Sequence, residues 1–218
     1  MEHSVKENTS HGLKKFIING QNSDFGRYPY HALLMHETGK GYCGGTLIAP
    51  DVILTAAHCE IPVWVGVGRH FRHTYSDGDE LHRILYSYRH PYFFQQTFDF
   101  DLILLKLRDT SAKPPIRLND DPKLPDVSQG SAQNVVTVAG FGKTHHGYAA
   151  DTIQEVNLNM ISNDVCEESR DPYSNVLDFQ IGYEGLIFDN MFCLADLSES
   201  GKDACSGKLF DVMVEKKN

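Results

Sequence analysis

The amino-acid sequence predicts an all-β protein, and three observations carry that prediction. Short runs whose side chains alternate with the two-residue period of a β-strand recur from residue 28 onward, and there is little helical periodicity. Turn-forming residues separate these runs. The chain of 218 residues is long enough to bury a core, and a turn-rich stretch near its middle divides it into two β units of about a hundred residues each.

Four segments carry the strand patterns most clearly. Residues 63–67 alternate valine with Trp and Gly, and residues 84–89 alternate Ile or Tyr with a second set of side chains. Residues 100–107 form the longest nearly apolar run, which reads as a buried strand with a carboxylate at its head. In the second half, residues 155–160 alternate polar and apolar side chains, which predicts a strand with one face inward.

The segments between the strands are polar. Residues 114–133 are dense in Pro, Asp, Ser and Gly, so they are predicted to form the ordered connection between the two units. Residues 1–16 are polar and of mixed charge, without the apolar stretch of a secretion signal, and are interpreted as a polar leader or propeptide.

Composition excludes several functions. The chain has 20 Lys plus Arg against 29 Asp plus Glu, a formal net charge of −9, so it offers no basic field for nucleic acid or an anionic membrane. No apolar stretch approaches the roughly 20 residues that span a bilayer. We therefore expect neither a nucleic-acid partner nor a membrane partner.

The residues that point to chemistry begin with two cysteines. Cys43 and Cys59 flank two predicted strands, and His58 directly precedes the second cysteine. A bridge between them would close a loop of about 15 residues, contribute on the order of 3 kcal/mol through the unfolded state, and hold His58 rigidly. Asp101 follows at the head of the buried strand.

These motifs resemble the chymotrypsin and trypsin family of serine endopeptidases over residues 17 to about 207. Residues 55–59 read Thr-Ala-Ala-His-Cys, and residues 101–107 fit the family's Asp-x-x-Leu-Leu-x-Leu pattern. Residues 17–20 resemble its activation sequence, and residues 138–144 resemble its Gly-Trp-Gly strand. The resemblance implies a double antiparallel barrel of Greek-key type.

The chemistry of that family gives the matched residues their expected roles. A serine hydroxyl is a poor nucleophile at neutral pH, so an imidazole must take its proton while a carboxylate holds the imidazole in the right tautomer. The resemblance makes His58 the general base and Asp101 the orienting carboxylate, and it makes Ile17 the activation N-terminus. Asp99 is predicted to be a solvated loop charge.

The resemblance breaks at the third catalytic residue. After residues 201–207 the family continues with Asp-Ser-Gly-Gly-Pro, whereas this chain reads Lys-Leu-Phe-Asp. Leu209 stands in the place of the nucleophile, and Lys208 replaces the carboxylate that pairs with the freed amino group. Ser206 lies three positions early, so it is not expected to substitute. Gly207 matches an oxyanion-hole position.

The family pattern also assigns the remaining site residues and the cysteines. Asp203 matches the carboxylate of the specificity pocket, which implies cleavage after Lys or Arg in an intact relative. The implied disulfides are Cys43–Cys59 and Cys166–Cys193, and Cys205 is left unpaired. Two disulfides favour an oxidising compartment, so we expect a secreted protein.

Five segments are therefore expected, the second barrel being cut short. They are the leader 1–16, the first barrel 17–113, the connection 114–133, the partial second barrel 134–207 and a divergent tail 208–218. A separate hypothesis is that the tail comes from an altered reading frame, and that the protein with an unaltered tail is an ordinary active protease. The abrupt loss of resemblance after Gly207 favours this hypothesis.

Taken as it stands, the sequence predicts a tryptic serine endopeptidase by descent that is inactive for want of a serine. A second hypothesis is a non-catalytic homologue that binds or inhibits a protein partner through its first barrel. We expect a monomer that acts on a peptide or protein, with no cofactor and no catalytic metal. Calcium binding by Asp77, Asp79 and Glu80 stays open, because calcium takes about six oxygens and three carboxylates fall short.

Overall fold

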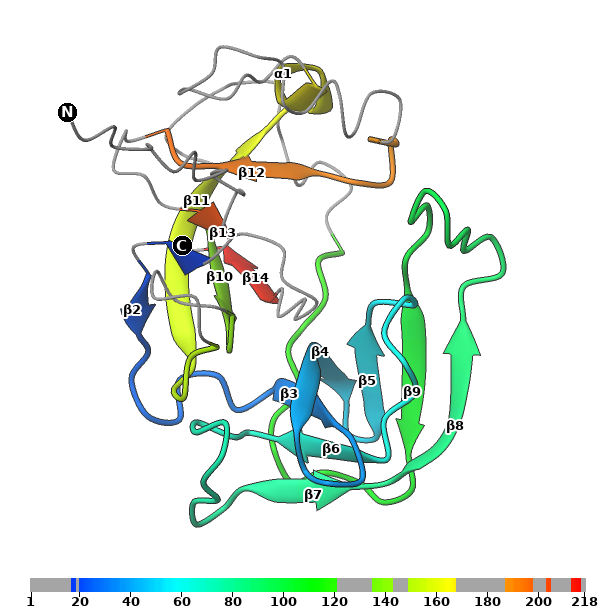
Figure 1. Ribbon diagram of the computed structural model, residues 1–218, viewed down its shortest axis with the longest axis vertical. Coiled ribbons are helices and arrows are strands. Elements are labelled where there is room, and N and C mark those ends of the chain that lie inside the picture. The colour runs from blue at the N-terminus through cyan, green and yellow to red at the C-terminus, as the bar shows by residue number, and fades with distance from the viewer. Residues whose placement is uncertain are drawn as a thin grey trace, which may run out of the picture.

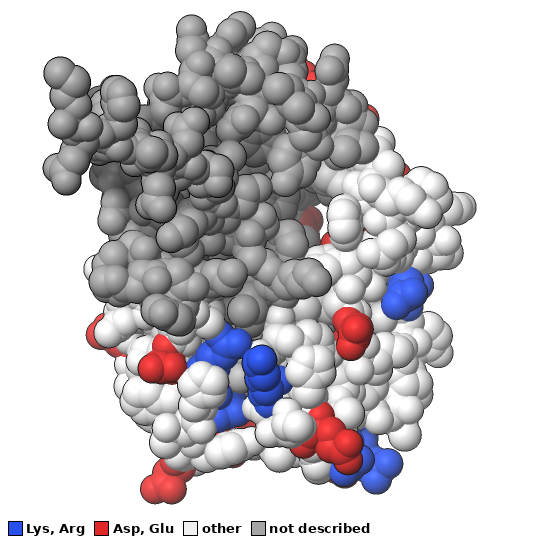
Figure 2. All heavy atoms as spheres, in the orientation of Figure 1, with Lys and Arg blue, Asp and Glu red and all other residues white. Residues whose placement is uncertain are grey.

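The computed structural model describes residues 17–18, 20–120, 135–142, 149–167, 187–197, 203–204 and 213–216. Nearly all regular structure in these residues is antiparallel strand, so the predicted all-β fold class is confirmed (Figure 1). Charged side chains of both signs are interspersed over the visible face of the described part (Figure 2). No helix in these residues is long and apolar enough to cross a bilayer.

The N-terminal half forms a curled sheet of seven strands in the order β7-β6-β3-β4-β5-β9-β8 (Figure 1). The strands are β3 (His31–Met35), β4 (Gly41–Ala49), β5 (Val52–Thr55), β6 (Trp64–Val67), β7 (Glu80–His82), β8 (Ile84–Arg89) and β9 (Ile103–Leu107). Their inward side chains form a core that includes Leu34, Leu47, Ile53, Val65 and Leu105, each at most 1% exposed.

The second half forms a sheet of five strands, in the order β12-β11-β10-β14 with β2 also paired to β11. These are β2 (Gln21–Asn22), β10 (Val135–Gly140), β11 (Gln154–Ile161), β12 (Cys193–Ala195) and β14 (Met213–Lys216). The inward residues predicted for 155–160 are confirmed, because Val156, Leu158 and Met160 are buried. They alternate with more exposed Glu155, Asn157 and Asn159 because successive strand residues face opposite sides.

Two further elements complete the description. A two-stranded sheet pairs β1 (Ile17–Ile18) with β13 (Asp203–Ala204), and the helix α1 (Asn163–Glu167) follows β11. A disulfide joins Cys166 of α1 to Cys193 of β12. Residues 114–120, the described part of the expected connection, contain neither helix nor strand, and the division of the chain into five segments stays a prediction.

The two larger sheets share one apolar cluster. Its members are Tyr28, Leu33, Met35, Ala139, Phe141 and Ile153, all at most 3% exposed. His31 is fully buried beside this cluster, with its ring centroid 5.3 Å from that of Phe141. Since apolar burial is the main favourable term in folding, this cluster links the stability of the two sheets.

A polar group lies next to the shared cluster. The Tyr28 hydroxyl donates to Glu155 Oε2 over 2.6 Å, Gln21 Nε2 donates to Oε1 over 2.9 Å, and Arg27 Nε lies 3.0 Å from Oε2. Burial and the hydrogen bond to Glu155 raise the pKa of Tyr28. Burial by itself raises the pKa of Glu155, but the bonds from Tyr28 and Gln21 and the charge of Arg27 hold that pKa below its usual value.

Candidate active site

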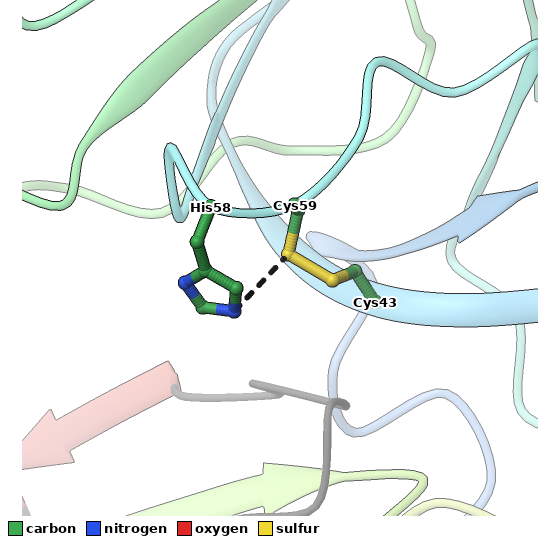
Figure 3. Close-up of side chains that lie close together, drawn as sticks. All are labelled: Cys43, His58 and Cys59. Carbon is green, nitrogen blue, oxygen red and sulfur yellow. Dashed lines mark hydrogen bonds between the residues drawn. A yellow bond between two sulfur atoms is a disulfide. The ribbon is translucent and has the colours of Figure 1, made fainter. Parts of the chain in front are cut away.

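His58 lies in the turn that follows β5, directly before Cys59. The Cys59 amide donates to Ala56 O over 3.2 Å, which closes the turn, and the disulfide ties Cys59 to Cys43 on β4. Figure 3 shows the imidazole beside this disulfide, with Nε2 facing the Cys59 sulfur at 3.9 Å. The ring is therefore positioned by a turn that two neighbouring strands anchor.

Asp101 lies two residues before β9 and contacts His58 with both carboxylate oxygens. The His58 backbone N–H donates to Oδ1 over 2.8 Å, and Oδ2 lies 2.5 Å from Nδ1. The two side chains are 14% and 19% exposed, so water screens this pair only in part. A carboxylate at Nδ1 favours the tautomer with the proton on Nδ1, which leaves Nε2 as the basic nitrogen.

The segment before Asp101 adopts an unusual backbone. Phe98 and Phe100 have φ angles of 58° and 50°, in the left-handed region where a bulky side chain costs about 1 kcal/mol or more. The Phe98 ring meets the His58 ring edge-on, with centroids 5.4 Å apart, and the Phe100 ring stacks on His90 at 4.6 Å. These ring contacts offset the backbone strain and place an aromatic side chain beside the imidazole.

Two contacts in this region were missed by sequence reasoning. Asp99 accepts an exposed hydrogen bond from Asn190 Nδ2 over 2.8 Å, and the sequence predicted the solvated loop charge but not this partner. Asn190 lies 91 residues further along the chain, and no local pattern signals its approach. The contact of Phe98 with His58 had one available signal, which is an aromatic residue three positions before Asp101.

The other predicted site residues are described only in part. Asp203 lies on β13, where its backbone pairs with Ile18, and Ile17 pairs with Ala204. These pairings place the expected activation segment beside the strand that carries Asp203. Five further positions considered in the sequence lie outside the described residues, namely Cys205, Ser206, Gly207, Lys208 and Leu209.

Two of the three carboxylates considered for calcium, Asp79 and Glu80, have separate protein partners. The side chain of Asp79 is 4% exposed and lies 3.8 Å from the Nε of Arg69, whose positive charge opposes a bound cation. Glu80 accepts hydrogen bonds from Ser111 Oγ over 2.5 Å and from Ala112 N over 3.1 Å. Within the described part of the chain, Asp77 joins neither of them in a cluster of three metal-ligand side chains.

One such cluster does occur in the described residues, and it consists of Cys43, His58 and Cys59. Metal ions bind cysteine as a thiolate, and the two sulfurs here are bonded to each other. The cluster is therefore a disulfide with a neighbouring imidazole, and it is not a metal site in this oxidation state.

Comparison with known proteins identifies the family of this chain. The Trypsin family profile matches residues 17–208. Mannan-binding lectin serine protease 1 of Mus musculus is 29% identical over 92% of this chain, and kallikrein-5 of Homo sapiens is 30% identical over 88% of it. The chain spans 29% and 60% of the length of these two relatives, respectively. Since the profile covers most of the sequence, the chain belongs to the trypsin family of serine proteases.

Proposed function

We propose that this chain is a trypsin-type protease homologue that keeps the general base and its orienting carboxylate but lacks the nucleophile, and that it does not hydrolyse peptide bonds. The observation that carries this proposal is the His58–Asp101 pair, in which one carboxylate accepts from the backbone amide and meets Nδ1 at 2.5 Å. In a trypsin-type site this arrangement lets Nε2 take a proton from a serine hydroxyl.

The sequence supports the proposal that the nucleophile is absent. Leu209 stands at the position of the nucleophile, and a leucine side chain has no atom that can attack a carbonyl carbon. The match to the family profile ends at Lys208, directly before that position. With no attacking oxygen, His58 has no proton to accept, and the catalytic cycle does not begin.

The proposal extends to substrate class and environment. Asp203 would be the carboxylate that selects Lys or Arg side chains of a bound peptide or protein, because a carboxylate forms strong hydrogen bonds with these cationic groups. Gly207 would supply one oxyanion-hole amide, and Ile17 would be the N-terminus after activation. Two disulfides favour an oxidising compartment, so the protein is proposed to be secreted. It is also proposed to be a monomer.

A fluorophosphonate probe, which forms a covalent bond only with an activated serine, tests this proposal. The chain, cleaved so that it begins at Ile17, is expected to remain unlabelled while unfolding cooperatively on heating. A chimera whose residues 208–218 are replaced by a tail with Asp-Ser-Gly-Gly-Pro is expected to become labelled. The matched control is the same chimera with His58→Ala, which is expected to lose the label.

Two outcomes would overturn the proposal. Labelling of the unaltered, folded chain would show that another side chain acts as the nucleophile. A folded chimera that stays unlabelled would show that His58 and Asp101 do not have the roles given to them.

A second candidate is binding of a protein partner without catalysis. The exposed apolar side chains of β8 and of the segment before β6 favour it, because Leu85, Tyr86, Tyr88 and Ile61 are between 47% and 65% exposed. Contiguous exposed apolar surface often marks an interaction site. The location and chemistry of that site are argued next.

A further inference from the structure

Strand β8 lies at one end of the strand order of the seven-stranded sheet. Strands β6 and β7 are paired from Val67↔Glu80 to Val65↔His82, and the pairing stops there. Beyond that point, residues 61–63 run on one side and β8 runs on the other, at the outer edge of the sheet (Figure 1). A groove of about 380 Å³ lies between these two segments.

The walls of this groove combine apolar and polar side chains. Ile61 and Leu85 are each 55% exposed, Tyr86 is 47% exposed, and Val63 and Ile84 also line the groove. Removing such side chains from water is favourable, so a partner that covers them gains affinity from their burial. These apolar side chains therefore favour an occupant that carries apolar side chains of its own.

The charged residues that line the groove are all positive. Arg83 and Arg108 line it, and no Asp or Glu does. The Arg83 guanidinium lies over the Trp64 ring at 4.1 Å, and Arg108 N donates to Arg83 O over 2.9 Å, which keeps the two residues adjacent. Neither guanidinium has an acidic partner among the described residues. In a chain of net charge −9, this local excess of positive charge favours an acidic occupant.

The backbone of β8 offers hydrogen-bonding groups along the same groove. Among the described strands β8 pairs only with β9. His90 N donates to Leu102 O over 2.9 Å, and the antiparallel register continues through Tyr88↔Leu104. Because hydrogen-bonding direction alternates along a strand, the N–H and C=O groups of Ser87 and Arg89 point away from β9. An open edge of this kind can accept an added strand.

We propose that this groove docks an extended acidic segment of a protein partner. The segment would pair with the open edge of β8, place carboxylates near Arg83 and Arg108, and cover Ile61 and Leu85 with its apolar side chains. The proposal rests on the second candidate function and is independent of the catalytic one, because neither His58 nor Asp101 lines the groove.

Fluorescence anisotropy with a defined probe tests the proposal. The probe is a fluorescein-labelled peptide of about ten residues in which Glu alternates with Val and Leu, a length that one strand can pair. Binding is expected to weaken as salt is raised, since exposed charges are screened. A second peptide with Lys in place of every Glu is expected to bind at least about tenfold more weakly.

Two variants of the protein locate the site. Arg108→Gln is expected to weaken binding of the acidic peptide by about threefold to tenfold. Arg117→Gln is the matched control, because Arg117 is also exposed, pairs with Asp120 and lies outside the groove. Ser87→Pro removes a backbone donor from the open edge while leaving the β9 register intact, and it is expected to abolish binding. If Ser87→Pro does not fold, a peptide N-methylated at alternate residues tests the same hydrogen bonds.

Several results would overturn the proposal. Equal binding by Arg108→Gln and Arg117→Gln would remove the groove as the site, and equal binding of the Glu and Lys peptides would remove the charge selection. Undiminished binding of the N-methylated peptide would exclude strand pairing. Self-association in sedimentation that Arg108→Gln abolishes would show that a second copy of this chain is the occupant. None of these results changes the outcome of the fluorophosphonate experiment.

Discussion

Asp101 contributes to the stability of the His58 turn independently of any catalysis. One carboxylate oxygen accepts from the backbone and the other meets the ring, so a single residue fixes both the course of the turn and the orientation of the imidazole. Removing a partner from a half-buried donor leaves that donor without a bond, which costs more than the bond itself contributed.

Substitution of Asp101 is therefore expected to lower the free energy of unfolding. Asp101→Ala leaves two donors without their acceptor and is expected to cost about 1–3 kcal/mol, whereas Asp101→Asn keeps one accepting oxygen and costs less. Urea unfolding followed by the fluorescence of Trp64, the single tryptophan, measures both. Asp99→Ala is the control, because its one bond to Asn190 is expected to contribute less than about 1 kcal/mol. Equal losses for Asp99→Ala and Asp101→Ala would contradict this account.

The pair itself was predictable, whereas the backbone beside it was not. His58 and Asp101 lie in motifs whose spacing is visible in the sequence. The positive φ angles of Phe98 and Phe100 give no such sign, because left-handed positions are normally marked by Gly, Asn or Asp. The ring contacts with His58 and His90 and the backbone hydrogen bond from Phe98 N to Phe94 O, which form in the folded chain, help to offset the cost of these conformations.

Individual strands were predictable where one face packs against the core. In β11 the alternation of Val156, Leu158 and Met160 directly gives the buried face. In β8 the pattern of Ile84, Tyr86 and Tyr88 gives the strand but not its faces. The register shifts between Ile84 and Tyr86, and such a slip moves later side chains to the opposite face. Both tyrosines therefore lie at the surface.

The bridge between β4 and the His58 turn is expected to be a large contributor to stability. Cys43 and Cys59 are separated by 16 positions, and opening a loop of that size by replacing both residues with Ser is expected to cost about 3 kcal/mol. Urea denaturation of the oxidised protein and the double variant measures the difference. The same change at Cys166 and Cys193 is the comparison, since it opens a longer loop in the other half of the chain. A loss below about 1 kcal/mol at Cys43 and Cys59 would contradict the cross-linking account.

The two halves of the chain are joined by contacts that no local pattern reveals. Tyr28 and Glu155 are 127 positions apart, and their hydrogen bond forms because β2 pairs with β11 and brings the residues after β2 over the second sheet. Composition and periodicity report on neighbours along the chain, so they give the strands of each sheet but not this contact between the two halves of the chain.

The Tyr28–Glu155 contact is expected to make the stability of the whole molecule depend on pH. Because the pKa of Glu155 in the folded chain lies below the ordinary value of 4.5, the carboxylate form favours folding. Its contribution is complete above about pH 4.5 and is lost as pH falls through the lowered folded-state pKa. The difference in unfolding free energy between the native chain and Glu155→Gln should therefore be largest near neutral pH and shrink in acid.

Urea titrations at about pH 7 and about pH 3 measure that difference. Tyr28→Phe removes the strongest hydrogen bond that lowers the pKa of Glu155, so it is expected to reduce the acid-sensitive part of the stability without altering the charge. Glu80→Gln provides an independent comparison in the other sheet, where burial raises the pKa of Glu80 but the bonds from Ser111, His82 and Ala112 and the charge of His82 together lower it. Since the two sites share no partner, their effects are expected to add.

A difference between the native chain and Glu155→Gln that stays constant from neutral pH to acid would contradict the proposed linkage, because an interaction of the ionised carboxylate must disappear when that carboxylate is protonated.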